Sequence, residues 1–488
     1  MKIIKAALIS LGVLTLVGSC TKDFDEMNVS PNDPTSISPQ YLLPYALEAS
    51  IDRYWGVRTR FERLNLDGAM CWMQYLTRNI YSNEGDNYEV SVGFYTNNWK
   101  GFFNDSQVNF QRIIALSGPG GQFENSNYEG VALVMRSWVF SLLTDTYGPI
   151  PYTDALKGTA TEPNYTPTYD PVETVYAGIL ADLKTANDKL TVGGASISGD
   201  ILYGGDVLKW KKFANSLRLR LANRQAAKKP AESKAIMAEI LGDATKYPVF
   251  TSNADNAKLA NSAVLPSNNE WHQVMIQDGR TDWNISKTIA DRLNELGDSR
   301  ITVYAQPNGA GKYEGHANGL PDAVATAYLG TSSVLGNYFT AATAPAVIMT
   351  YSELNLILAE AAADGDIAGS AQTYLEKGVT ASFEQYGLTV PAGYLTKIGT
   401  ATKATILEQK WISLFGQAIE AWTEYRRTGL PVLPAKDSRA VFSNDGVMPT
   451  RLKYPTSEYS LNKASLDQGI SLLGGADDMK STLWWVEK

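Results

Sequence analysis

The spacing of bulky apolar residues between Thr402 and Arg427 constrains the fold more than any other feature of this sequence. Residues three and four apart share one face of a helix, so this spacing predicts one helix with a single packed face, ending at Gly429 and Pro431. Such a face needs other elements to cover it. The apolar positions are Leu407, Trp411, Leu414, Phe415, Ala418, Trp422 and Tyr425.

Similar patterns along the chain predict a mostly α-helical fold. Asp170 and Pro171 offer an N-cap and a proline at the first helical position for a helix over 170–190. Thr350 and Glu353 form a capping-box pattern for a helix that should end at Asp364-Gly365, and a second helix over 367–386 follows. Further helices are predicted at 41–54, 62–78, 97–116, 128–146, 208–227, 231–242 and 284–296.

The order of these helices predicts an architecture. Helices paired through short turns are typical of a helix-turn-helix stack, although no strict repeat is visible. The stretches 244–349 and 428–488 are rich in Asn, Gly, Pro, Ser and aromatic residues, with one clear helix between the irregular parts. We interpret both as irregular excursions from the scaffold, where binding residues tend to lie.

The N-terminus has the features of a secretion signal. Lys2 and Lys5 precede an apolar run from Ala6 to Val17, and Gly18-Ser19 leads into Cys20. As a helix this run spans about 18 Å, short of the roughly 30 Å hydrocarbon core, so it predicts a cleaved signal peptide rather than an anchor. We therefore expect a signal peptide at 1–19, a hydrophilic tether at 20–40 and a single helical domain at 41–488.

Composition excludes several functional classes. The chain has 43 Lys and Arg against 51 Asp and Glu, a net charge of −8 without a basic block, so a nucleic-acid partner is not expected. Two His and two Cys leave little material for zinc sites or Cys-His nucleophiles. We predict no catalytic residue, metal site or cofactor. Incidental calcium binding at the 278–282 turn stays open, because that turn lacks a complete ligand set.

Aromatic residues divide into core and ligand-binding candidates. Trp99, Trp138, Trp210, Trp411 and Trp422 have helical spacing and are predicted to lie in the core. The ligand-binding candidates are Trp271 and Trp283, the loop residues Tyr81, Asn83 and Tyr88, and Tyr304, Tyr313 and Tyr338 in the 244–349 excursion. A flat ring beside amides and carboxylates suits a sugar or a peptide. The alternative is that these side chains only cap their own loops.

Several longer motifs resemble one family. Residues 135–138, 147–152, 213–222, 353–365, 415–431 and 449–455 resemble, in this order, motifs of the SusD/RagB family of nutrient-binding outer-membrane lipoproteins. The Glu420-Ala-Trp-Thr-Glu-Tyr-Arg-Arg427 string is the most specific of them. The resemblance covers essentially all of residues 20–488.

The resemblance implies a fold and a role. It implies tetratricopeptide-like helix pairs, an irregular loop-rich lobe that binds oligosaccharides or peptides, and docking as a lid on a SusC-like TonB-dependent transporter barrel. Cys20 resembles the lipobox cysteine of bacterial lipoproteins, which carries the acyl anchor (palmitate), and the acidic residues after it resemble a signal for export to the outer face of the outer membrane. A surface glycoside hydrolase and a structural scaffold without a small ligand remain the alternatives.

Overall fold

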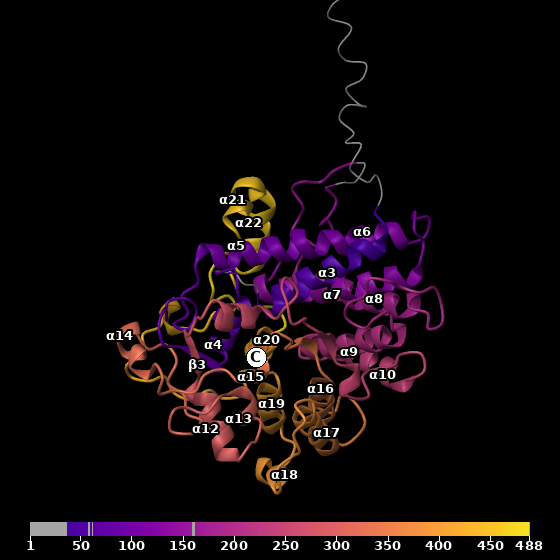
Figure 1. The fold of residues 1–488 in the computed structure, drawn as a ribbon. Helices are drawn as coiled ribbons and strands as arrows, with labels where there is room; N and C mark the ends of the chain where they lie inside the picture. Colours follow the sequence, from indigo (N-terminus) through magenta and orange to yellow (C-terminus); the bar gives the residue numbers. More distant parts are fainter. Residues whose placement is uncertain (1–36, 57–58, 61, 159–161, 488) are drawn as a thin grey trace, which may run out of the picture.

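The elements of the fold are mostly helices (Figure 1). A computed structural model describes residues 37–56, 59–60, 62–158 and 162–487, so the predicted signal peptide, Cys20 and most of the tether lie outside the described residues. The longer helices are α3 (Pro39–Trp55), α5 (Val92–Lys100), α6 (Val108–Ser117), α7 (Ser126–Tyr147), α8 (Val172–Lys189), α9 (Val207–Gln225), α10 (Pro230–Gly242), α12 (Lys287–Leu296), α16 (Tyr351–Ala363), α17 (Ala371–Glu384), α19 (Lys403–Ser413), α20 (Ala418–Thr428) and α22 (Lys463–Leu472).

Short elements fill the connections between these helices. The short helices are α4 (Met70–Trp72), α11 (Glu270–His272), α13 (Ile301–Tyr304), α14 (Asp322–Ala325), α15 (Asn337–Thr340), α18 (Tyr394–Ile398) and α21 (Thr456–Leu461). The π-helical turns are η1 (Leu64–Ala69), η2 (Gly101–Gln107) and η4 (Gln273–Gln277), and the 3₁₀ turns are η3 (Asn253–Asp255), η5 (Thr326–Tyr328) and η6 (Asn444–Gly446). The strands are β1 (Leu76–Arg78), β2 (Ala257–Leu259), β3 (Trp283–Ile285) and β4 (Ala346–Met349).

Helices adjacent in sequence pack side by side, which confirms the predicted helical scaffold. α7 packs on α8, α8 on α9 and α9 on α10, while α16 packs on both α17 and α19 (Figure 1). β1 and β3 form one antiparallel pair and β2 and β4 another. Within the described residues, no helix is long and apolar enough to cross a bilayer.

The predicted single helix over 402–427 is wrong. The chain forms two helices, α19 and α20, and Gly416 between them has a φ of +90°, a conformation that favours glycine. A Cβ at Gly416 would lie 3.1 Å from Trp55 and 3.0 Å from Phe339, so the break also brings the backbone close to two core rings. Both helices still bury their apolar faces, with Trp411 in α19 and Trp422 in α20.

Other predicted boundaries also need correction. The range 62–78 is not one helix but η1, α4 and β1, since Thr77 and Arg78 pair with β3. The predicted 284–296 helix starts only at Lys287, and the 97–116 helix begins earlier, at Val92, and runs through η2 to Ser117. Thr350 caps α16 through its Oγ1, which accepts from the Glu353 N–H at 3.0 Å, but the Glu353 carboxylate does not complete a capping box.

The Glu353 carboxylate instead belongs to a buried network of ion pairs that joins the helices. It accepts two bonds from Arg220 of α9, at 2.7 and 2.6 Å. One turn further along α9, Arg224 binds Asp145 of α7 at 2.7 Å and pairs with Glu420 of α20. Other members are Glu360, Lys410, Glu424 and Arg427. Buried charges need partners, so this network explains why the charged positions of the 213–222, 353–365 and 415–431 motifs occur together.

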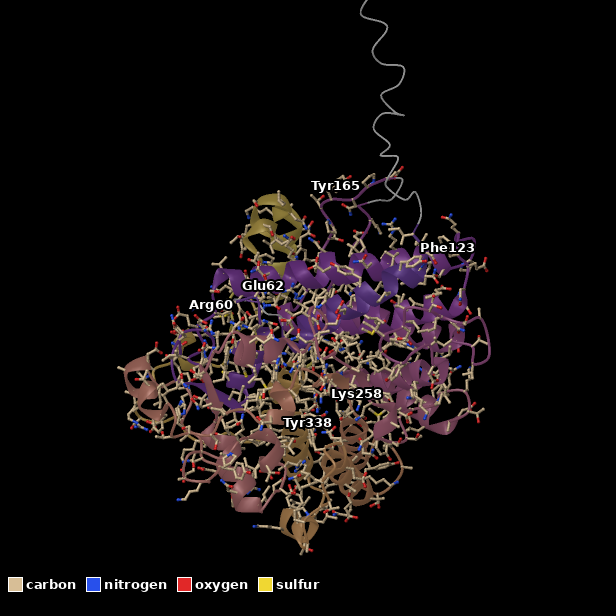
Figure 2. All side chains as sticks on the ribbon, in the orientation of Figure 1. Arg60, Glu62, Phe123, Tyr165, Lys258 and Tyr338 are labelled. Carbon is tan, nitrogen blue, oxygen red and sulfur yellow. The ribbon has the colours of Figure 1, made fainter. Side chains whose placement is uncertain are left out.

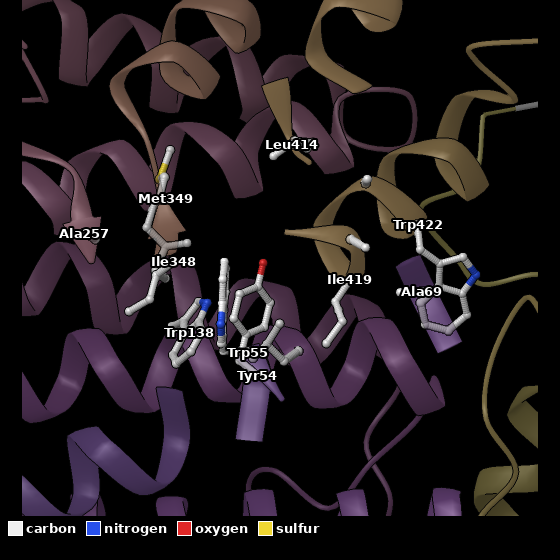
Figure 3. Close-up of a cluster of buried hydrophobic side chains, with 14 of the residues drawn as sticks. Tyr54, Trp55, Ala69, Trp138, Ala257, Ile348, Met349, Leu414, Ile419 and Trp422 are labelled. Carbon is white, nitrogen blue, oxygen red and sulfur yellow. The ribbon is translucent and has the colours of Figure 1, made fainter. Parts of the chain in front are cut away.

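The aromatic core lies between these helices (Figure 3). Trp138 of α7 contacts Tyr54 of α3 edge-on, with the ring centroids 5.3 Å apart. All five tryptophans predicted to be core residues are buried, and Trp99, the most exposed of them, is only 7% exposed. The core prediction for these rings is confirmed.

Candidate ligand-binding site

The 81–88 loop is held in place by the buried carboxylate of Asp86. This carboxylate accepts bonds from the Thr77 hydroxyl at 3.0 Å, the Asn318 amide at 2.6 Å and the Gly319 N–H at 3.1 Å. Burial raises the pKa of Asp86, while these bonds oppose the rise. The contacts fix the loop to β1 on one side and to the 316–319 segment on the other.

The backbone of the same loop also packs closely against the 67–72 segment. Gly85 has a φ of +116°, and a Cβ there would lie 2.0 Å from the Asp67 carbonyl oxygen, so this position requires glycine. The Trp72 indole donates to the Gly85 carbonyl at 3.0 Å. Tyr81 and Tyr88 have positive φ values of 56° and 68°, which are uncommon for large side chains. Backbone strain of this kind is often found at binding sites.

A surface hollow of about 420 Å³ lies between this loop and α14. Asn83 and Asn87 line it from the loop, Asp322 from α14 and Val441 from the C-terminal excursion. The Asp322 carboxylate accepts bonds from the backbone N–H groups of Tyr81 at 3.1 Å and Ser82 at 2.9 Å. Burial alone would raise the pKa of Asp322, but the bonds from Ser82 and Tyr81 outweigh it and lower that pKa, so the carboxylate is ionised at neutral pH.

Two tyrosines are close in the chain to the residues that line the hollow: Tyr81 precedes Ser82, and Tyr328 follows α14. Tyr81 is 41% exposed, and the guanidinium carbons of Arg60 and Arg280 lie 5.1 and 5.6 Å from its ring centroid. Tyr328 follows α14 and stacks on His316, with centroids 4.7 Å apart. Burial lowers the pKa of His316 to about 4, so a neutral imidazole supports the Tyr328 ring. Together these groups offer ring surface, amides and one carboxylate, the set that binds sugar hydroxyls and pyranose faces.

The structure corrects the prediction that Trp271 and Trp283 are open stacking platforms, because both rings are buried. Trp271 is 0% exposed and stacks on Trp55, with the ring centroids 4.7 Å apart. Trp283 is 3% exposed, with the guanidinium groups of Arg78 and Arg63 at 4.7 and 5.4 Å from its ring centroid. Neither ring has a free face for a ligand in this structure.

Three of the other predicted tyrosines also lie in or against the core. Tyr304 is fully buried and stacks on Phe415, with the ring centroids 4.2 Å apart. Tyr88 is buried and stacks on Phe442, with the ring centroids 4.4 Å apart. Tyr313 is half-buried and packs against the core. A ligand-stacking role for Tyr304 and Tyr88 is therefore corrected to a packing role.

Tyr338 keeps an exposed ring but lies elsewhere. It is 37% exposed and meets Phe339 and Tyr386 edge-on. Figure 2 shows it well apart from Arg60, which contacts the Tyr81 ring. Of the predicted set, only Tyr81 and Asn83 come together at one exposed place.

Sequence reasoning missed Asp322, Tyr328 and Val441. Asp322 follows Pro321 at the start of a short helix. This local pattern predicts a helix N-terminus and gives no sign of a binding role. Its contact with Ser82 joins residues 240 positions apart, so no local signal reveals it. Among the described residues, no group of three or more His, Cys, Asp or Glu side chains could hold a metal ion.

The chain is similar to a known family and to several solved structures. A SusD-like family model, described as starch-binding and associating with the outer membrane, matches residues 31–455. A solved chitin-binding protein is 29% identical, with a TM-score of 0.80 over 92% of this chain and 100% of that chain.

Other solved structures share the fold. A chitin-binding SusD homologue from Flavobacterium johnsoniae is 24% identical, with a TM-score of 0.78 over 91% of this chain and 98% of its own. A SusD homologue from Bacteroides uniformis is 25% identical, with a TM-score of 0.79 over 92% of this chain and 100% of its own. No curated protein matches the chain.

Proposed function

Because the chain belongs to the SusD-like family of starch-binding proteins associated with the outer membrane, we propose that it captures oligosaccharides at the hollow beside the 81–88 loop. The observation that carries this proposal is that Asn83, Asn87 and the ionised Asp322 line one hollow. The exposed Tyr81 precedes this lining in the chain, and its backbone N–H donates to Asp322. The Tyr81 ring stacks on a pyranose face, and the amides and the carboxylate take its hydroxyl groups.

An uncharged glycan is the ligand class that this hollow favours. Asp322 is the only charged residue among those that line it within the described part of the chain, and its negative charge disfavours acidic ligands. The guanidinium groups beside Tyr81 are themselves paired, Arg60 with Glu84 and Arg280 with Asp282. Chitin-derived oligosaccharides are the first probes to use, since a 29% identical relative is a chitin-binding protein.

The role is binding rather than catalysis. Glycoside hydrolysis needs two carboxyl groups, one of them able to donate a proton. Asp322 is one carboxylate with a lowered pKa, so it suits hydrogen bonding to hydroxyls and is a poor proton donor at neutral pH. The family is one of binding proteins.

The captured glycan passes to a SusC-like TonB-dependent transporter barrel, on which this chain acts as a lid. In this proposal Cys20 carries the lipid anchor, which holds the protein at the outer membrane with the helical domain facing the cell exterior. The acyl chains supply the membrane attachment, and the tether leaves the domain free to open and close over the barrel.

A depletion screen tests the binding role. The mature chain is incubated with neutral glycans (chitin, starch and cellulose fragments) and with a matched peptide library, and both bound fractions and products are measured. The proposal expects one class of neutral glycan to be depleted without cleavage products. Released sugars would favour the hydrolase, depleted peptides would move the ligand class, and depletion of nothing would favour the scaffold.

A further inference from the structure

A second cleft, of about 390 Å³, lies between α12, α19 and the Pro431–Asp437 segment. Its volume is typical of small-ligand sites. Trp411 of α19 lines it, and so does Phe442, which follows Val441 of the first hollow. The two sites share no lining residue, and none of the aromatic residues predicted to bind ligand lies in this cleft.

One wall of the cleft is aliphatic and exposed. It is formed by the run Val432-Leu433-Pro434-Ala435, in which Val432 is 83% exposed and Leu433 is half-buried. Within the described residues, no hydrogen bond is found for the backbone N–H or C=O groups of Val432 to Lys436. This wall therefore offers methyl groups next to free backbone donors and acceptors.

The residues of α12 and α19 that line the cleft carry charges that are already paired. Arg292 binds Glu408 through two bonds of 2.8 Å and Glu295 through a third. Lys287 pairs with Asp291 at 2.5 Å. The cleft is also lined by Lys436, whose Nζ donates to the Gly446 carbonyl, and by Asp437, which pairs with Arg439. A charged ligand would have to displace one of these internal partners, so the cleft favours an uncharged ligand.

The floor between the two walls is polar and aromatic. Gln74 has a positive φ of 56°, and its side-chain oxygen accepts from the Thr288 hydroxyl. For its amide N–H groups, no acceptor is found among the described residues. The Trp411 indole donates to the Met73 carbonyl at 3.0 Å, and one ring face stacks on Tyr75. Both Gln74 and Trp411 line the cleft.

We propose that this cleft is a second glycan subsite that takes an uncharged sugar unit bearing an N-acetyl group. The acetamido methyl packs on the Val432–Ala435 wall, and the acetamido N–H and C=O pair with the free backbone groups and with Gln74. A plain hexose has only hydroxyl groups to place against the aliphatic wall, and burying them there without partners is unfavourable. This inference rests on the proposed function and specifies the sugar that it takes.

Fluorine NMR on the full mature chain, labelled with 5-fluorotryptophan, tests the subsite. The Trp411 resonance is assigned with Trp411→Phe, and the probes are N,N′-diacetylchitobiose and cellobiose, a disaccharide without acetamido groups. We expect a saturable shift of the Trp411 signal with diacetylchitobiose and none with cellobiose. Leu433→Asp should weaken that response at least tenfold, whereas Val447→Asp, an exposed valine outside the cleft, should leave it unchanged.

Calorimetry on the same samples separates the two proposals. If diacetylchitobiose binds and Tyr81→Ala weakens it, but the Trp411 signal does not move, the second subsite is wrong and the proposed function stands. If the signal responds equally to both disaccharides, the N-acetyl preference is wrong. If neither disaccharide binds by either method, the second subsite is wrong, and the depletion screen then decides whether the proposed function stands.

Discussion

The amide of Asn318 donates a 2.6 Å hydrogen bond to the buried carboxylate of Asp86, and this bond connects the candidate binding loop to the long excursion. The same amide donates to the Leu76 carbonyl at 2.7 Å, and its oxygen accepts from the Ser286 hydroxyl at 2.6 Å. One buried side chain thus joins β1, the N-cap residue of α12 and the 81–88 loop. These contacts hold the loop that lines the hollow, although neither Asn318 nor Asp86 lines the hollow itself.

Removing this side chain should destabilise the fold and loosen the loop. In Asn318→Ala, Asp86 and the Leu76 carbonyl each lose a buried partner, so we expect a loss of about 1–3 kcal/mol in the free energy of unfolding, measured with urea. Asn83→Ala, an exposed loop position, serves as the control and should change stability by less than about 0.5 kcal/mol. Equal stability of both variants and wild type would show that Asn318 does not hold the loop.

Because Trp271 is buried, replacing it should lower the stability of the fold. Its ring stacks on Trp55, and its indole donates to the Trp55 carbonyl at 3.2 Å. Trp271→Ala should cost about 3–5 kcal/mol, as expected for a large buried ring. Trp271→Phe keeps most of the packing and should cost much less, and Tyr165→Ala, at a 75% exposed ring, should cost nothing measurable. A Trp271→Ala protein with a wild-type melt would contradict the buried position.

Local periodicity was enough to predict most of the helices and their core tryptophans. A helix buries its face in a regular pattern, so Trp138, Trp210 and Trp422 could be placed without knowing their neighbours. The break at Gly416 could not be predicted, because the helical spacing continues through it. Its cause is the close approach of Trp55 and Phe339, residues remote in the sequence.

The ligand site was also hard to predict, because it too depends on contacts between residues that are remote in the sequence. Polar neighbours around Trp271 suggested an open loop, but the Asn269 amide donates to the buried Phe339 and Ala341 carbonyls at 2.7 and 3.0 Å. Buried amides that satisfy backbone groups look, in sequence, like amides that bind sugar. Tyr81 and Asn83 differ from them only through long-range contacts such as the one with Asp322.

Asp52 should make stability fall as pH rises. Burial raises the pKa of Asp52 to about 8, with further contributions from Glu270 and Glu48 and an opposing one from Arg53. The folded state therefore holds this proton more tightly than the unfolded state, whose Asp pKa is about 4. The contribution of Asp52 to the free energy of unfolding is most favourable below about pH 4. It is lost as the pH rises from about 4 to about 8, by up to about 1.4 kcal/mol per pH unit.

The comparison of wild type with Asp52→Asn isolates this effect from all other titrating groups. The variant should gain stability relative to wild type as the pH is raised from 5 to 8 in steps, measured by urea unfolding. Asp467→Asn, at an exposed carboxylate that pairs with Lys463, is the surface control. A constant difference for Asp52→Asn would contradict the raised pKa.

Cys20→Ala should release the protein from the membrane. If Cys20 carries the acyl chains, its loss removes the only proposed membrane attachment, and metabolic labelling with a fatty-acid analogue should give no label on the variant. Cys71→Ala is the matched control, because Cys71 is a buried free cysteine. It should keep both the label and the membrane fraction. Equal labelling of Cys20→Ala and wild type would rule out the anchor.

The central claim is that the hollow beside the 81–88 loop binds the glycan, and calorimetric titration with the best neutral oligosaccharide from the screen tests it most directly. Tyr81→Ala and Asn83→Ala should each weaken binding by about 1 kcal/mol or more, at least about fivefold, with melts close to wild type. Tyr165→Ala, another exposed tyrosine, should bind as wild type does. Wild-type affinity in both loop variants would contradict the account and place the site elsewhere.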